Sequence, residues 1–140
     1  MYLIDTNVIS EARKKGNANP GVIAFFRRAV EEGQALYLSV VTVGELRRGV
    51  ELIRHRGDGR QAKALEAWLT GMLEQFRSNV LAFDADAAQV CGRLRVPHAE
   101  HEIDKQIAAI ALVNNLTVVT RNTAEFAGTG VDLLNPFQAA

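Results

Sequence analysis

The sequence predicts an α/β fold, a three-layer α/β/α arrangement in which helices cover both faces of a mostly parallel, five-stranded sheet. Short apolar runs alternate with longer amphipathic segments, a pattern typical of strands connected by helices. The apolar runs show little polar alternation, as expected of parallel strands buried on both faces. A length of 140 residues with 48% hydrophobic content matches a single domain, which we assign to residues 1–140.

The strands are predicted from short apolar segments bounded by polar residues. Nothing hydrophilic precedes the first apolar run, which predicts a central strand, and Asp5 directly follows it. The fourth segment is the clearest, because it has β-branched residues at four consecutive positions. The five expected strands are residues 2–4, 36–40, 80–83, 116–120 and 131–134.

The helices are predicted from apolar spacing and from capping residues. Asn19 and Pro20 suit the N-cap and the first turn of one helix, and Gly33 suits its C-terminal end. Asp84 similarly suits the N-cap of a later helix. The expected helices span about residues 8–13, 20–32, 42–53, 61–78, 85–96 and 103–114.

Residues 42–78 are expected to form an amphipathic helical hairpin. Leu46, Val50 and Ile53 follow helical spacing, and the second helix carries a longer apolar stripe that includes Trp68. The polar connection between the two helices is short, which favours an antiparallel pair. This hairpin is a candidate docking surface for a protein partner.

Composition limits the classes of function. Sixteen basic and sixteen acidic residues cancel, so net charge gives no indication of a nucleic-acid partner. The single Cys91 excludes an internal disulfide and a thiolate metal cage, which favours a reducing compartment. We find no signal-peptide pattern and no apolar run approaching the roughly 20 residues of a membrane span, so we expect a soluble, cytoplasmic protein without membrane association. Nucleotide-binding glycine loops and the GxSxG nucleophile motif are also absent.

Three acidic residues occupy the ends of strands or the first turns of helices. Asp5 follows the first strand, and taken alone it is equally consistent with a ligand-binding role and with a local turn or helix cap. Glu45 completes a Thr42-x-x-Glu45 capping box, which is the better explanation of that residue in isolation. Asp104 lies in a first helical turn, where the helix dipole alone favours an acid.

Considered together, these acids predict a metal site. Ligands bind at the carboxyl edge of a parallel sheet, where Asp5, Glu45 and Asp104 are expected to meet Asn122 and Glu125 from the exit of the fourth strand. Gathered carboxylates repel one another unless a cation neutralises them. Hard oxygen donors without cysteine indicate Mg²⁺ or Mn²⁺, which activate water and stabilise charge on a phosphoryl group.

Other chemistry-bearing residues give weaker signals. His98-x-x-His101 could chelate a metal, but two histidines in a polar loop are more often solvated. Arg47 and Arg121 lie near the predicted acidic edge and are candidates for contacts with an RNA backbone, although basic residues on helices are commonly solvated.

Four short motifs resemble those of the PIN-domain ribonucleases, specifically the toxins of VapC type and their FitB-like branch. They are Leu3-Ile4-Asp5-Thr6-Asn7, Val43-Gly44-Glu45-Leu46-Arg47-Arg48-Gly49, Asp104-x-x-Ile107-Ala108-Ala109 and Thr120-Arg121-Asn122-x-x-Glu125-Phe126. Each motif alone is weak, but the four occur in the family's order across nearly the whole chain.

The resemblance implies strand order 3-2-1-4-5 and a Mg²⁺- or Mn²⁺-dependent endoribonuclease that hydrolyses RNA phosphodiesters with a metal-activated water. Asp5, Glu45 and Asp104 would form the acidic triad, completed by Asn122 or Glu125, while Thr6, Asn7 and Thr120 would orient the ligands. The resemblance also implies a toxin that homodimerises and is inhibited by a cognate antitoxin, in a larger toxin–antitoxin assembly.

The fourth motif departs from the family pattern, since many members have aspartate where Asn122 and Glu125 stand. We therefore expect one tightly held ion, with a second only when RNA phosphate helps to bind it. Two alternatives remain open at this stage. One is a receiver-like phosphoacceptor with Asp5 in an acidic pocket, and the other is a catalytically silent PIN-fold module that binds RNA or protein.

Overall fold

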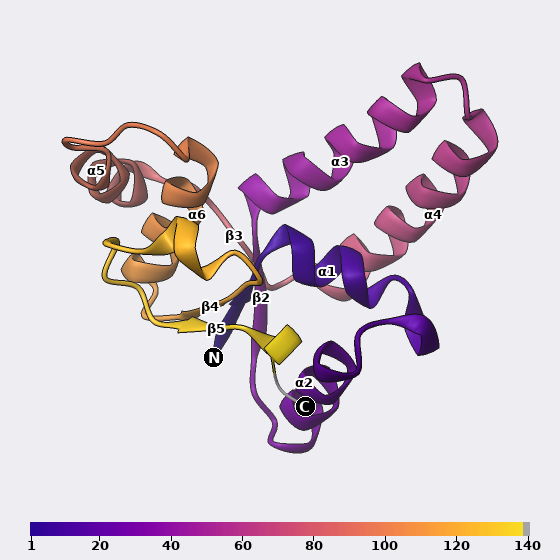
Figure 1. The fold of residues 1–140 in the computed structure, drawn as a ribbon, viewed down its shortest axis with the longest axis horizontal. Helices are drawn as coiled ribbons and strands as arrows, with labels where there is room; N and C mark the ends of the chain where they lie inside the picture. The colour runs from indigo at the N-terminus through magenta and orange to yellow at the C-terminus, as the bar shows by residue number, and fades with distance from the viewer. Residues whose placement is uncertain (139–140) are drawn as a thin grey trace.

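Five strands form one parallel sheet with the order β3-β2-β1-β4-β5, which confirms the predicted α/β class and strand order. The structure is a computed structural model that describes residues 1–138 (Figure 1). The strands are β1 (Tyr2–Ile4), β2 (Leu36–Ser39), β3 (Val80–Leu81), β4 (Thr117–Val119) and β5 (Leu133–Leu134). The α-helices are α1 (Thr6–Ala12), α2 (Pro20–Glu31), α3 (Val40–His55), α4 (Gly59–Gln75), α5 (Ala85–Leu94) and α6 (Glu102–Val113). Single 3-10 turns are η1 (Lys15–Asn17), η2 (Thr123–Phe126) and η3 (Pro136–Gln138).

The central strand β1 has apolar side chains on both of its faces. Successive side chains of a strand point to opposite faces, and Leu3 and Ile4 accordingly join two different hydrophobic clusters. Val118 and Val119 of the neighbouring β4 divide in the same way. All four side chains are fully buried, which explains why the strand sequences show no polar alternation.

The helices form a layer on each face of the sheet. Apolar residues of α1, α2, α3 and α4 build the cluster on one face, and those of α5 and α6 build the cluster on the other. This arrangement confirms the predicted three layers. It also brings the N-termini of α1 and α3, which directly follow β1 and β2, to the carboxyl edge of the sheet.

Helix α3 begins earlier than the sequence predicted, and the Thr42-x-x-Glu45 capping box is wrong. Ser39 is the N-cap, and its hydroxyl accepts a hydrogen bond from the Thr42 amide at 3.0 Å. Ser39 also donates to the Thr42 hydroxyl, at 3.2 Å. With the amide of Thr42 already bonded, Glu45 lies beyond the first turn and its side chain is not needed for capping.

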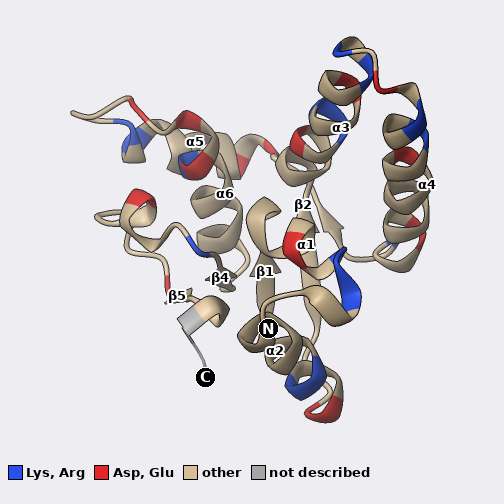
Figure 2. Cartoon of the chain, turned by 45° about the vertical axis from the view of Figure 1, so that its right-hand side comes forward, with Lys and Arg blue, Asp and Glu red and all other residues tan. Residues whose placement is uncertain are grey.

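Helices α3 and α4 pack against each other at the place of the predicted hairpin, with bounds shifted by a few residues. Its connection is shorter than expected because Asp58 caps α4, accepting from the Gln61 amide at 3.0 Å. The hairpin extends away from the sheet (Figure 1) and carries both charge signs along its length (Figure 2).

The edge strands β3 and β5 are two residues long, shorter than the predicted segments 80–83 and 131–134. Each pairs on one side only, with β2 and β4 respectively, so the apolar residues beyond the paired positions leave the sheet. Within residues 1–138 no helix has the length and apolar character needed to cross a membrane.

Candidate functional site

Asp5 stands at the carboxyl end of β1 and is almost completely buried, with 4% of its surface exposed. It is the N-cap of α1, and its Oδ1 accepts from the Thr6 amide at 2.8 Å. Its Oδ2 accepts from the Thr120 hydroxyl at 2.7 Å and from Asn7 Nδ2 at 3.2 Å. The local capping role considered from the sequence is therefore real, and it holds the carboxylate in one orientation.

The residues that hold Asp5 are themselves connected to the exit of β4. The Thr120 hydroxyl accepts from the Asn122 amide at 3.0 Å, and Asn7 Oδ1 accepts from the Arg121 amide at 3.1 Å. Because each group has a fixed partner, the supporting residues that the sequence predicted form one rigid network around Asp5.

Asp5 is the N-cap of α1, Asp104 lies in the first turn of α6 and Glu45 lies in the second turn of α3, and all three line one hollow of about 260 Å³. The remaining lining residues are Thr6, Asn7, Ile103 and Asn122. Asn122 contributes no charge there, as expected from its side chain. The convergence that the sequence predicted for these positions is present in the structure.

The carboxylates of this hollow perturb one another. Burial raises the pKa of Asp104 to about 7, assisted by hydrogen bonding to Glu125 and by the charges of Asp5, Glu125 and Glu45. Burial also raises the pKa of Asp5, although its bonds from Thr120, Thr6 and Asn7 partly oppose the shift. A site of gathered, desolvated carboxylates binds a divalent cation favourably, because the cation removes the repulsion.

Glu125 of η2 reaches the same group of acids, together with a residue that the sequence interpretation placed elsewhere. Ligand atoms of His101, Asp104 and Glu125 all lie within 4.8 Å of one another. The sequence paired His101 with His98, but the His98 Nδ1 lies 3.5 Å from Glu100 in an exposed pair. The spacing of His101 three residues before Asp104, across a helix start, is the signal that could have identified it.

The two arginines predicted to contact RNA differ in their surroundings. Arg47 points into the hairpin, where its guanidinium pairs with Glu66 at 2.6 Å and Glu51 at 3.2 Å. Arg121 lies next to the acidic hollow through its backbone, and its guanidinium stacks 4.7 Å above the ring of Phe137. Of the two, Arg121 is better placed for a phosphate that approaches the acids.

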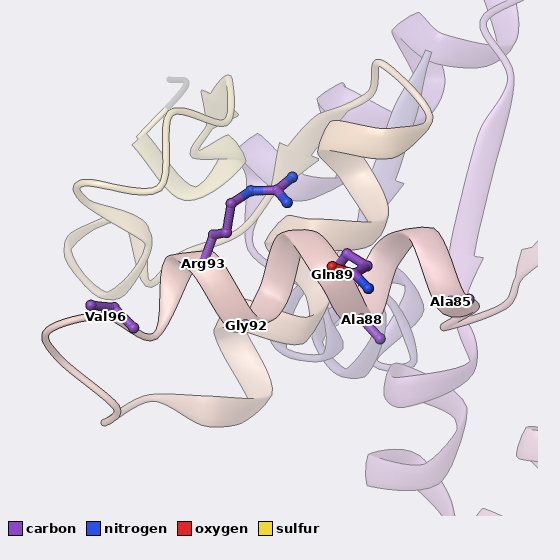
Figure 3. A pocket seen from close by; sticks show the side chains of 6 residues that line it. All are labelled: Ala85, Ala88, Gln89, Gly92, Arg93 and Val96. Carbon is purple, nitrogen blue, oxygen red and sulfur yellow. The ribbon is translucent and has the colours of Figure 1, made fainter.

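A larger hollow, of about 850 Å³, lies along α5 and contains none of these acids (Figure 3). It is lined by Ala85, Ala88, Gln89, Gly92, Arg93 and Val96. We assign the chemistry to the smaller hollow, because size does not compensate for the lack of convergent polar groups.

The donor set of the acidic hollow fits a hard divalent cation. Four carboxylates, from Asp5, Glu45, Asp104 and Glu125, and the Asn122 amide supply oxygen ligands of the kind that Mg²⁺ and Mn²⁺ bind. Cys91, the only thiol in the sequence, is buried on α5 within the hydrophobic cluster that α5 and α6 build. These residues can hold a cation against a phosphate group.

Comparison with known proteins agrees with the fold. Residues 2–130 match the PIN domain family. The chain is 36% identical to the toxin FitB of Neisseria gonorrhoeae, over 98% of this chain and 99% of FitB. It is 33% identical to the VapC ribonuclease Y4jK of Sinorhizobium fredii, over the full length of both. A structure of FitAB bound to a DNA fragment superposes with a TM-score of 0.85 at 32% identity, covering 100% of this chain and 98% of that one.

Proposed function

Because the chain belongs to the PIN domain family, we propose that it is a metal-dependent endoribonuclease and the toxin of a toxin–antitoxin pair. The observation that carries the proposal is the convergence of Asp5, Glu45 and Asp104 in one hollow. Full-length similarity to a protein named VapC ribonuclease and to a protein named toxin FitB supports both parts of the proposal.

Each residue has a role that follows from its position. Asp5 and Asp104 would hold the cation, Glu45 would hold it or orient the attacking water, and Glu125 and Asn122 would complete the ligand set from η2 and its cap. Thr6, Asn7 and Thr120 keep the Asp5 oxygens directed into the hollow.

The bound Mg²⁺ or Mn²⁺ would lower the pKa of a water molecule and offset the charge that develops on the phosphodiester. The chain's own contribution is a fixed, partly desolvated set of oxygens in which these effects are strengthened. Arg121 is joined through its backbone amide to Asn7, which lines the hollow, and its guanidinium would have to leave the Phe137 ring to contact a phosphate of the RNA.

The alternatives from the sequence now have less support. A receiver domain has the strand order 2-1-3-4-5, which differs from the order β3-β2-β1-β4-β5 of this sheet. A silent PIN-fold module would have no need to hold Asp5 and Asp104 close together at a cost in electrostatic repulsion. A measurement of RNA cleavage distinguishes the two functions, because the silent module would not cleave RNA.

Removal of divalent cations is expected to abolish RNA cleavage by the purified chain. The carboxylates cannot approach an RNA phosphate without a cation, because both carry negative charge. Cleavage is measured on total cellular RNA with excess EDTA, then after addition of Mg²⁺ or Mn²⁺, and the 5′ ends of the products are sequenced. Undiminished cleavage in EDTA, or no cleavage with either cation, would contradict the proposal.

A groove that adjoins the acidic hollow is the proposed docking site of the antitoxin. One hollow of about 310 Å³ shares Thr6 and Glu45 with the acidic hollow and continues past Arg13, Gly49 and Trp68. A second hollow of about 480 Å³ shares Arg13 and Trp68 with the first and continues to Phe26 of α2. A peptide segment lying in this groove would end at the acids and exclude RNA.

Gly49→Gln is expected to weaken antitoxin binding by about tenfold or more, because the new side chain occupies the groove. A Cβ at Gly49 meets no atom within 4 Å, so the first atom of the new side chain meets no steric clash. The matched control is Gly92→Gln, another helical glycine with free space, in the α5 hollow of Figure 3. Affinity for the protein encoded beside the toxin gene is measured by calorimetry. A loss confined to Gly92→Gln would place the antitoxin on α5 instead.

Homodimerisation, which the resemblance implies, stays a prediction for this chain. Sedimentation velocity of the purified toxin, with and without antitoxin, measures both the dimer and any larger assembly.

A further inference from the structure

His101 directly precedes helix α6 and has a left-handed backbone, with φ 59° and ψ 45°. This conformation is uncommon for residues other than glycine, although histidine adopts it more readily than most. The His101 carbonyl accepts from the Lys105 amide at 3.0 Å, so the residue forms part of the helix start. Asp104 therefore lies about one helical turn further along the chain.

The distances among His101, Asp104 and Glu125 are close to those of a coordination shell. One ligand atom from each lies within 4.8 Å of the other two. Donors bound to one ion at about 2.0–2.2 Å lie at most about 4.4 Å apart. The three side chains therefore need to move closer together than they lie in this structure for all of them to contact the same cation.

The loop before α6 is fixed to the helix that carries Asp104. Lys105 is buried, with 8% of its surface exposed, and its Nζ donates to the His98 carbonyl. A buried lysine is rare unless its charge is satisfied, so this bond ties the loop to α6. His101 and Asp104 therefore belong to the same helix start, and α6 packs against η2, which carries Glu125.

We propose that His101 is a metal ligand of this site, sharing the cation with Asp104 and Glu125, and that it makes the site prefer Mn²⁺ over Mg²⁺. Mg²⁺ strongly favours oxygen ligands, whereas imidazole nitrogen is a good ligand for first-row transition metals. The inference rests on the proposed metal dependence and adds to it the identity of a nitrogen ligand and a cation preference.

Binding of each cation to His101→Gly tests the proposal. Glycine adopts positive φ without strain, so the variant removes the imidazole and keeps the backbone. We expect the Kd for Mn²⁺, measured by calorimetry on metal-free protein, to rise by about tenfold or more, and the Kd for Mg²⁺ to change by less than about twofold. His98→Gly, in the same loop, is the matched control and leaves both constants unchanged. An equal change for both cations, or no change for Mn²⁺, would overturn the proposal.

Nuclear magnetic resonance gives a second readout that is independent of mutation. The chain has three histidines, His55, His98 and His101, so their ring signals can be assigned with single variants. Substoichiometric Mn²⁺ is expected to broaden the His101 signals first and to leave those of His55 sharp. If the protein binds Mn²⁺ while the His101 signals stay sharp, this inference fails and the proposed nuclease stands. If no Mn²⁺ binds, both fail.

Discussion

Asp5→Asn is expected to lower the rate of RNA cleavage by on the order of 10⁴-fold while the chain remains folded. The substitution removes one negative charge from the centre of the acidic hollow and leaves a side chain of the same shape. The cation loses a ligand that the structure holds in a fixed orientation, so the remaining acids bind it more weakly and in a different geometry.

The effect on stability should be small, because two contributions oppose each other. Removing a buried carboxylate relieves the desolvation that raises the pKa of Asp5. The new amide nitrogen, however, faces Asn7 Nδ2 where an oxygen had accepted a hydrogen bond, and Asn7 cannot turn because its Oδ1 holds the Arg121 amide. We expect the free energy of unfolding to change by no more than about 1 kcal/mol.

The measurement compares initial rates of RNA cleavage at saturating Mg²⁺, together with urea unfolding of both proteins. Asp132→Asn is the matched control, since this aspartate is exposed and lies outside the acidic hollow. Cleavage by Asp5→Asn at the rate of the unchanged protein would rule out the proposed metal centre.

The layers of the fold could be predicted because they follow from local periodicity. Leu3 and Ile4, like Val118 and Val119, are apolar at consecutive positions, as expected of a strand covered on both faces. The strand order could not be predicted in this way, because periodicity does not determine which strands are neighbours. Its prediction came from the resemblance of four motifs to a known family.

The sequence was insufficient where two local signals compete and where a contact comes from a distant segment. Ser39 and Thr42 are both good capping residues, and the sequence does not show that β2 ends at Ser39. The ion pair of Arg47 with Glu51 follows from their spacing on one helix, but its shorter pair with Glu66 depends on the packing of α4 against α3. His101 was missed as a neighbour of the acids for a similar reason, because Glu125 reaches it from a distant segment.

Asp104→Asn is expected to make the metal-free protein more stable at pH 8 and to leave its stability near pH 4 unchanged. The folded-state pKa of Asp104 is raised to about 7, above the usual value near 3.8, by burial, by Glu125 and by the charges of Asp5 and Glu45. Between these two values the folded chain binds more protons than the unfolded chain, so its stability falls as the pH rises. Asparagine does not titrate, and this loss is absent from the variant.

Solvent screening reduces the difference in stability between the variant and the unchanged protein, because Asp104 is only partly buried. After allowing for screening, we expect the variant to be about 1–2 kcal/mol more stable above pH 8, with the difference developing between about pH 4 and pH 8. Urea unfolding in EDTA at several pH values measures this difference in the free energy of unfolding. Asp132→Asn is the control, and its difference from the unchanged protein should not change between pH 4 and pH 8 in this way. A difference that stays constant with pH would show that Asp104 is not under electrostatic strain.

Addition of Mn²⁺ should reverse the order of stability of the two proteins, because a cation that binds only the folded state stabilises most the protein that binds it more tightly. That reversal connects the strain in the empty acidic cluster to its proposed task, since the repulsion that destabilises the metal-free fold is the interaction that a bound cation removes.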